Sequence, residues 1–199
     1  QSAWLDELCL TGEVGWGRLD PPTLSLDRTP GGNLTRVAPL SLFLRGDLGW
    51  LLPRPKEGEV APLSSPAEEV RELLQRDGAS FAADLLQQTR MLPTHLEEAL
   101  GELISRGTVT ADSFAGLRSL IAEKKDMIGR ATRHHTAGLS RRRMLGTVSG
   151  RWSIWRRHPD ATALNETERL QAWCWQLLRR WGVVFRDLLT RDDAAPRWW

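Results

Sequence analysis

Positively charged side chains are concentrated in residues 124–157 of this sequence. Ten Lys and Arg residues stand there against one acidic residue, a net charge of about +9, whereas the whole chain carries +2. Such a segment is typical of a surface that faces a polyanion, and the planar guanidinium of Arg pairs well with phosphate. The alternative is a solvated loop without a ligand. The predicted phosphate-binding residues are Arg141, Arg142, Arg143, Arg151, Arg156 and Arg157.

Tryptophan is the second unusual feature, with ten Trp residues and no Tyr. An indole ring can stack on an unpaired base at about 1–3 kcal/mol. Trp175 falls off the apolar stripe of its predicted helix and is expected to be exposed beside Arg179. Trp16 and Trp50 lie in a strand-rich part of the chain, where core packing and base stacking stay equally open. The predicted base-stacking residues are therefore Trp16, Trp50 and Trp175.

Residues for catalysis or metal binding are harder to find. His134 and His135 are adjacent, but no third and fourth ligand stands at a spacing that a zinc site uses. An enzyme that removes a damaged base needs a carboxylate beside the extruded nucleotide, and the sequence singles out none of Asp77, Asp84 and Asp112. We therefore predict no catalytic residue and no metal site in this chain.

Four segments must position these side chains, and residues 1–63 are the first. A short helix at 4–10, strands at 14–19 and 37–44 and an apolar patch at 50–52 predict a small strand-containing lobe. A connector rich in Pro and charged residues ends it.

Residues 64–122 carry the clearest helical pattern, three short helices followed by a strand at 108–110. Ser65 and Glu68 form a predicted capping box for the first helix, and Ser80 is the predicted cap of the second. This order predicts a winged helix, and the alternative is a plain three-helix bundle with a loose tail. The side chains expected to face inward are Val70, Leu73, Leu74, Phe81, Leu85, Leu86, Leu96, Ala99, Leu100, Leu103 and Ile104.

The third helix would be the recognition helix if this winged helix read duplex DNA. Thr94 and Glu97 form its predicted capping box, and its outward face carries Glu97, Glu98 and Glu102. Carboxylates in a major groove repel the phosphates. The unit is therefore expected to pack against neighbouring domains or to hold a single strand by another face.

Residues 123–160 are predicted to form a basic loop and a returning strand anchored by Trp152. Residues 161–199 begin with a helix capped by Asn165 and Glu168 and start a truncated second winged-helix unit. The predicted fold class is α+β, mainly α: a winged helix plus a small strand-containing lobe and the start of a second helical unit. The apolar stripe of the last long helix comprises Leu170, Trp173, Cys174, Leu177, Leu178 and Trp181.

Cellular location is indicated by what the sequence lacks. No apolar run approaches the roughly 18 residues of a membrane span, and the first ten residues do not resemble a secretory signal. Cys9 and Cys174 stand in apolar surroundings and are predicted to be buried free thiols. We expect a cytoplasmic protein with no membrane contact. Because the chain starts without Met and ends on Trp199, we also expect a piece of a larger protein.

Five stretches resemble the region that follows the motor domains in the large helicase-related (Lhr) family of superfamily 2 DNA helicases. They occur in one order along the chain, and the basic loop is the divergent part. The stretches are residues 4–14, 97–110, 114–118, 150–153 and 177–186.

The resemblance implies a parent protein that moves along single-stranded DNA with ATP and Mg²⁺ and acts in DNA repair. It also implies that this accessory region contacts single-stranded DNA and the motor domains of the same chain, with a fold similar to tandem winged-helix DNA glycosylases. The sequence departs from a motor because it has no Gly-x-x-x-x-Gly-Lys-Ser/Thr loop and no Asp-Glu-x-His box. The chain alone is expected to need no cofactor and to hydrolyse no ATP.

Three functional hypotheses follow. The first is a binding module that grips single-stranded DNA for an Lhr-type helicase. The second is an enzyme, a DNA glycosylase-like domain that excises a damaged base. The third is a scaffold in which the basic loop binds nothing. Base-excision assays separate the first two, and salt-dependent binding to labelled single strands separates the third.

Overall fold

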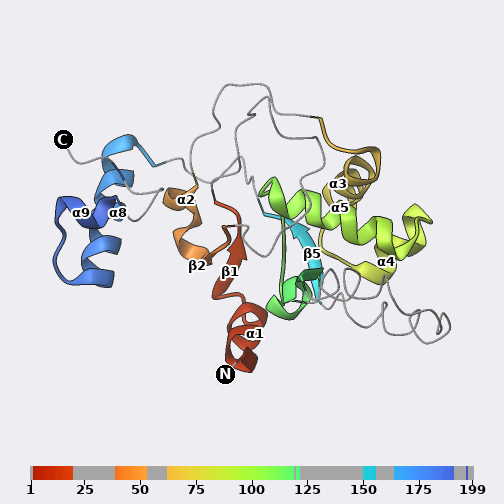
Figure 1. Cartoon of the computed structure of the whole chain (residues 1–199), viewed down its shortest axis with the longest axis horizontal. Helices are drawn as coiled ribbons and strands as arrows, with labels where there is room; N and C mark the ends of the chain where they lie inside the picture. Colours follow the sequence, from red (N-terminus) through yellow and green to blue (C-terminus); the bar gives the residue numbers. More distant parts are fainter. Residues whose placement is uncertain are drawn as a thin grey trace, which may run out of the picture.

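The computed structural model describes residues 2–19, 39–52, 62–118, 120–121, 150–155, 164–190 and 196. In these ranges the fold is α+β and mainly helical, as predicted (Figure 1). The helices are α1 (Ser2–Leu10), the 3-10 turn η1 (Arg45–Asp47), α2 (Leu48–Leu51), α3 (Ser65–Asp77), α4 (Ala82–Thr89), α5 (Pro93–Ser105), α8 (Glu166–Trp181) and α9 (Arg186–Leu189). The strands are β1 (Val14–Gly17), β2 (Ser41–Leu44), β3 (Ser80–Phe81), β4 (Val109–Ala111) and β5 (Arg151–Ile154).

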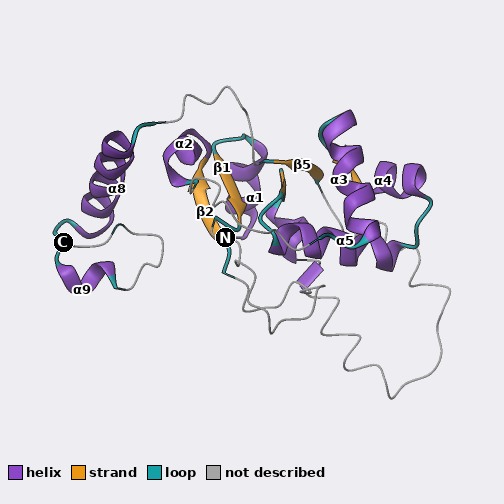
Figure 2. Cartoon of the chain, turned by 90° about the horizontal axis from the view of Figure 1, so that it is seen from above, coloured by secondary structure: helices purple, strands orange, loops and turns teal. Residues whose placement is uncertain are grey.

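The N-terminal lobe is built on an antiparallel pair, β1 and β2, in which Trp16 lies opposite Leu42 and Gly15 opposite Phe43. Helix α1 leads into β1, and α2 follows β2 after the turn η1. Both views of the chain show β1, β2 and α2 between the α3–α5 group and α8 (Figures 1 and 2). The lobe therefore joins the two helical parts of the chain.

Helices α3, α4 and α5 pack together beside a three-stranded antiparallel sheet of order β3-β5-β4. Three helices with a small antiparallel sheet are the arrangement of a winged helix. The chain continues from β4 into a helical segment at residues 114–118 and 120–121, and it returns in β5. The strand before the basic segment, β4, and the strand inside its C-terminal part, β5, are thus neighbours in one sheet.

The capping of α3 differs from the sequence prediction. Ser64, not Ser65, is the N-cap, and its hydroxyl accepts a hydrogen bond from the Ala67 N–H. The reciprocal carboxylate comes from Glu102 on α5, which accepts hydrogen bonds from the Ser64 hydroxyl at 2.6 Å and the Ser64 N–H at 3.2 Å. Glu68 forms an ion pair with Arg71 instead. A tertiary contact therefore replaces the local capping box.

The second and third helices also begin differently from the prediction. Ser80 lies buried in β3 and donates to the Gly78 carbonyl oxygen, so it does not cap α4. Helix α5 begins at Pro93 after Leu92, without a side-chain cap, so the predicted capping box at Thr94 is wrong. Proline suits a first helical position because the N–H that it lacks would have no helical partner there.

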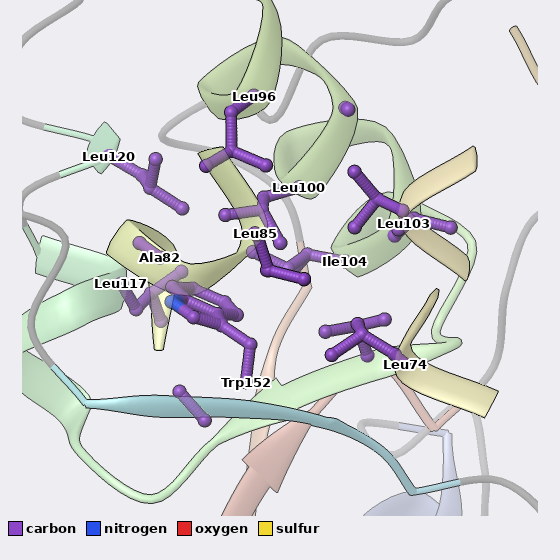
Figure 3. Packing of buried hydrophobic residues seen from close by; sticks show 14 of the residues in the cluster. Leu74, Ala82, Leu85, Leu96, Leu100, Leu103, Ile104, Leu117, Leu120 and Trp152 are labelled. Carbon is purple, nitrogen blue, oxygen red and sulfur yellow. The ribbon is translucent and has the colours of Figure 1, made fainter. Parts of the chain in front are cut away.

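The main core lies between these helices and the sheet. The inward stripe of α5 is confirmed, because Leu96, Leu100, Leu103 and Ile104 are at most 2% exposed. Figure 3 shows these side chains facing Leu85 from α4, with Trp152 from β5 below them. Trp152 is fully buried, so its predicted role as the anchor of the returning strand is confirmed.

Aromatic rings connect the lobe to the winged helix. The ring of Trp16 contacts Trp152 and Phe114 edge to face, at centroid distances of 6.1 and 6.2 Å. Beside them, the Thr110 hydroxyl donates to the Trp16 carbonyl oxygen at 2.5 Å. Edge-to-face pairs and this buried hydrogen bond fix β1 against β4.

A second, smaller core joins α2 to α8. Trp50 and Trp173 meet edge to face at 5.3 Å, and Leu177 completes the buried set. The Arg169 side chain also donates to the Trp50 carbonyl oxygen at 3.0 Å. Asn165 and Glu168 form the predicted capping box at the start of α8. Among the described residues, helix α8 is therefore held by its contact with the lobe.

Candidate nucleic-acid interface

Most of the predicted phosphate-binding residues lie outside the described residues. These are Arg141, Arg142, Arg143, Arg156 and Arg157. The structure does describe both points where the basic segment meets the fold: residues 120–121 before it, and residues 150–155 within its C-terminal part. Because β4 and β5 are paired, the part of the segment before β5 occupies the chain position of a wing.

Arg151 is exposed, as predicted, and is fixed by Asp112. Its backbone N–H and its side-chain Nε donate to the two oxygens of the Asp112 carboxylate, at 2.7 and 2.9 Å. Gly150 before it has a φ of +97°, and a Cβ there would lie 2.7 Å from the Asp112 carboxylate. Glycine is therefore required where the basic segment returns to the sheet.

Phe81 is a candidate that the sequence pattern missed. It was predicted to face inward, but its side chain is 53% exposed. The two-residue strand β3 pairs Ser80 with Trp152 and Phe81 with Arg151, so Ser80 takes the inward position and Phe81 the outward one. An exposed aromatic ring thus lies opposite an exposed arginine. No local signal predicts this, because the register is set by a strand about seventy residues later in the sequence.

Two of the three predicted base-stacking tryptophans are in cores. Trp16 is 0% exposed and Trp50 is 8% exposed. A buried indole cannot stack on a base, so this placement corrects their assignment to the interface. Trp50 also donates to the Asp47 carboxylate at 3.1 Å, which satisfies its N–H. Trp175 remains a candidate, since it is 56% exposed on α8.

The outer side of α8 is more apolar than predicted. Trp173 and Leu177 are buried, but Leu178 and Trp181 are 40% and 45% exposed, and Cys174 is exposed as well. The contact with α2 therefore buries one part of the apolar stripe, and the other part is exposed to solvent. The guanidinium of Arg180 lies 5.1 Å from the centre of the Trp181 ring.

Helix α5 is poorly placed to read a major groove. Residues 99–104 are all buried, and they include Glu102, which was expected to face outward. Glu98 is exposed, and Glu97 is half-buried. The Arg106 side chain pairs with Glu102 at 3.7 Å and donates to the Pro62 carbonyl oxygen at 3.2 Å. The prediction that this helix is not a groove-reading element rested on its charge, and its burial is a stronger reason.

Asp6 on α1 has a structural role near the same sheet. Its carboxylate accepts hydrogen bonds from the Ala115 N–H at 2.7 Å and from the Ser113 hydroxyl at 3.3 Å, and it forms an ion pair with Arg118. Burial raises the pKa of this carboxyl, but the hydrogen bonds from Arg118 and Ala115 outweigh burial and hold the pKa below its ordinary value of 3.8. Asp6 therefore ties α1 to the segment that leads into the basic region.

The described ranges also bear on metal binding and membrane contact. There, no group of three or more His, Cys, Asp or Glu side chains could hold a metal ion. His134 and His135 lie outside these ranges. No described helix has the length and apolar character to cross a bilayer. Both cysteines are free, but only Cys9 is buried as predicted.

Comparisons with known proteins agree with the resemblance to Lhr proteins that the sequence indicated. A family model described as "Large helicase-related protein, winged-helix domain" matches residues 163–199. The "Lhr helicase/uracil glycosylase" of Escherichia coli (strain K12) is 28% identical over 156 residues, which cover 70% of this chain. The "Lhr helicase/ probable uracil glycosylase" of Mycolicibacterium smegmatis (strain ATCC 700084 / mc(2)155) is 29% identical over 209 residues, which cover 98% of it.

These matches confirm the resemblance to the accessory region of Lhr proteins. The chain spans about a tenth of the length of the curated relatives it matches, 10% and 12%. The winged-helix match falls on the part of the chain that begins just before α8, where the sequence predicts the start of a second unit.

Proposed function

We propose that this chain, similar to the accessory region of Lhr helicases, binds single-stranded DNA while an ATP-dependent motor of the same parent protein moves along it during repair. ATP and Mg²⁺ belong to that motor, and the chain alone is not expected to hydrolyse ATP. The two partners of this region are then the single strand and the motor domains.

The observation that carries the proposal is the place of the basic segment in the fold. Residues 112–150, with eight Lys and Arg against three acids and so a net charge of +5, are inserted between two paired strands of the winged-helix sheet, and Arg151, Arg156 and Arg157 follow directly. Helix α5 buries residues 99–104 in the same unit and exposes Glu98, so it offers a major groove little surface beyond an acidic side chain. Affinity would therefore come from phosphate contacts and from exposed aromatic rings, which favours unpaired strands.

Binding to a fluorescein-labelled oligo(dT) strand at graded salt concentrations tests the proposal. Each phosphate that the protein neutralises should steepen the plot of log K against log salt by about 0.7 for a single strand. We expect a slope that corresponds to several contacts and weaker binding to a blunt duplex. Absence of binding at low salt would overturn the proposal and favour a scaffold.

Base excision is the second candidate function, because the names of both relatives include uracil glycosylase. Three carboxylates on the described part of the chain, those of Asp6, Glu102 and Asp112, bind groups of the fold itself. The groove between α3 and α4 is lined by Glu69, Glu72, Leu73, Gln75, Arg76 and Gln88, without an aromatic ring to hold an extruded base. Release of uracil from a single strand by the pure chain, absent for the same strand without uracil, would establish this alternative.

A further inference from the structure

The outer face of the β3–β5 pair carries an aromatic ring next to a guanidinium. Phe81 and Arg151 are directly opposed in the antiparallel register, so their Cβ atoms are about 4.5–5.5 Å apart on one face. The neighbours of this pair, Ser80 and Trp152, point the other way into the core and are 8% and 0% exposed. The strand register therefore directs both the Phe81 and the Arg151 side chain to the outer face.

Both outward groups are accessible. The Phe81 side chain is 53% exposed, and the Arg151 side chain is 57% exposed. The Asp112 carboxylate binds Arg151 through the backbone N–H and Nε, and the two terminal amino groups of the guanidinium take no part in this contact. Those amino groups can bind an anion while Asp112 fixes the direction in which they point.

We propose that Phe81 and Arg151 form a subsite for one nucleotide of a single strand, in which Phe81 stacks on the unpaired base and Arg151 binds the adjoining phosphate. Asp112 is a positioning residue for Arg151. The subsite rests on the proposed function, and it identifies a surface that would bind the single strand. An unpaired strand is the occupant, because a paired base does not present its face to a ring.

Charge complementarity supports a nucleic-acid occupant over a protein. Arg151 belongs to the segment of net charge about +9, and Gly150 forms a bend directly before it at the start of β5. A strand whose phosphates contact Arg151 would pass the outer face of β3 and β5. An apolar protein surface would gain little beside that charge, since burying charged guanidinium groups is costly.

The test compares variants in binding to a fluorescein-labelled oligo(dT) strand and to a matched strand of abasic residues. F81A should weaken binding to oligo(dT) about 5- to 100-fold, the value of one stacked base, without a change in salt slope. F81W should restore the affinity because indole also stacks. R151Q should instead reduce the salt slope by about 0.7, the value of one phosphate contact. On the abasic strand, F81A should bind like the wild type.

Leu92 provides the matched control, because it is a large apolar side chain of the same winged helix and is 58% exposed. L92A should bind both strands like the wild type. Equal affinities of F81A and the wild type for oligo(dT) would overturn the subsite and leave the proposed function intact, as would equal losses in F81A and L92A. Absence of binding by the wild type itself would overturn both proposals.

Discussion

Glu102 links two helices through a contact that the sequence does not reveal, and its removal has a definite expected effect. Its carboxylate binds the Ser64 hydroxyl and N–H at the start of α3, and its side chain is 8% exposed. Hydrogen bonds to a charged group contribute about 1.5–3 kcal/mol, against about 0.5–1.5 kcal/mol for neutral ones. Glu102→Gln keeps the shape but removes the charge and puts an amide donor where an acceptor is needed. We expect a loss of about 2 kcal/mol in the free energy of unfolding.

Urea unfolding followed by far-UV circular dichroism measures this loss. With a denaturant slope of about 2 kcal/mol per M, the midpoint should fall by about 1 M. Glu98→Gln is the matched control, because Glu98 lies exposed on the same helix and should change stability by less than about 0.5 kcal/mol. Neither variant should weaken binding to oligo(dT). Equal midpoints for Glu102→Gln and the wild type would refute the reasoning, and lost affinity in the folded variant would show that α5 contacts the strand.

Three further predictions concern the two cores and the tie to α1. Leu100→Ala should cost about 2–5 kcal/mol of unfolding free energy, because Leu100 is 0% exposed, and an unchanged thermal midpoint would show that its stripe is not core. Trp173→Ala should release α8 from α2 and speed amide hydrogen exchange in α8 while exchange in α5 stays slow; uniform acceleration would contradict two separate cores. Asp6 has a lowered pKa, so its stabilising contribution is present above pH 3.8 and is lost as the pH falls through the folded-state pKa. The wild type should therefore lose more stability than Asp6→Asn on acidification, and parallel curves would argue against this role.

Sequence patterns predicted the structure correctly where the interacting residues are close in sequence. The capping box of α8 joins Asn165 and Glu168, three residues apart, and it forms as predicted. The stripe of α5 repeats at helical spacing and is buried on the predicted side. Trp152 was placed correctly because a large aromatic residue where a strand rejoins the fold has few alternatives to burial.

Predictions failed where a residue distant in sequence determines which way a side chain faces. Glu102 is buried because Ser64, thirty-eight residues earlier, donates to it, so helical spacing alone placed it outward. Phe81 faces outward because β5 sets the register of a two-residue strand, and a helical pattern had placed it inward. The sequence pattern left open whether Trp16 and Trp50 lie in a core or at the surface. Their contacts with Trp152 and Trp173 show that both lie in cores.

Removal of charge from the basic segment tests the central claim most directly. The variant Arg141→Ala, Arg142→Ala, Arg143→Ala should be compared with a control that replaces Arg45, Arg76 and Arg186, three exposed arginines elsewhere in the fold, with Gln. The affinity of each variant for labelled oligo(dT) is measured across a series of salt concentrations. If the basic segment binds the strand, the first variant loses affinity and about 0.7 of salt slope per phosphate contact, whereas the control changes little. An unaltered affinity and slope in the first variant would contradict the account.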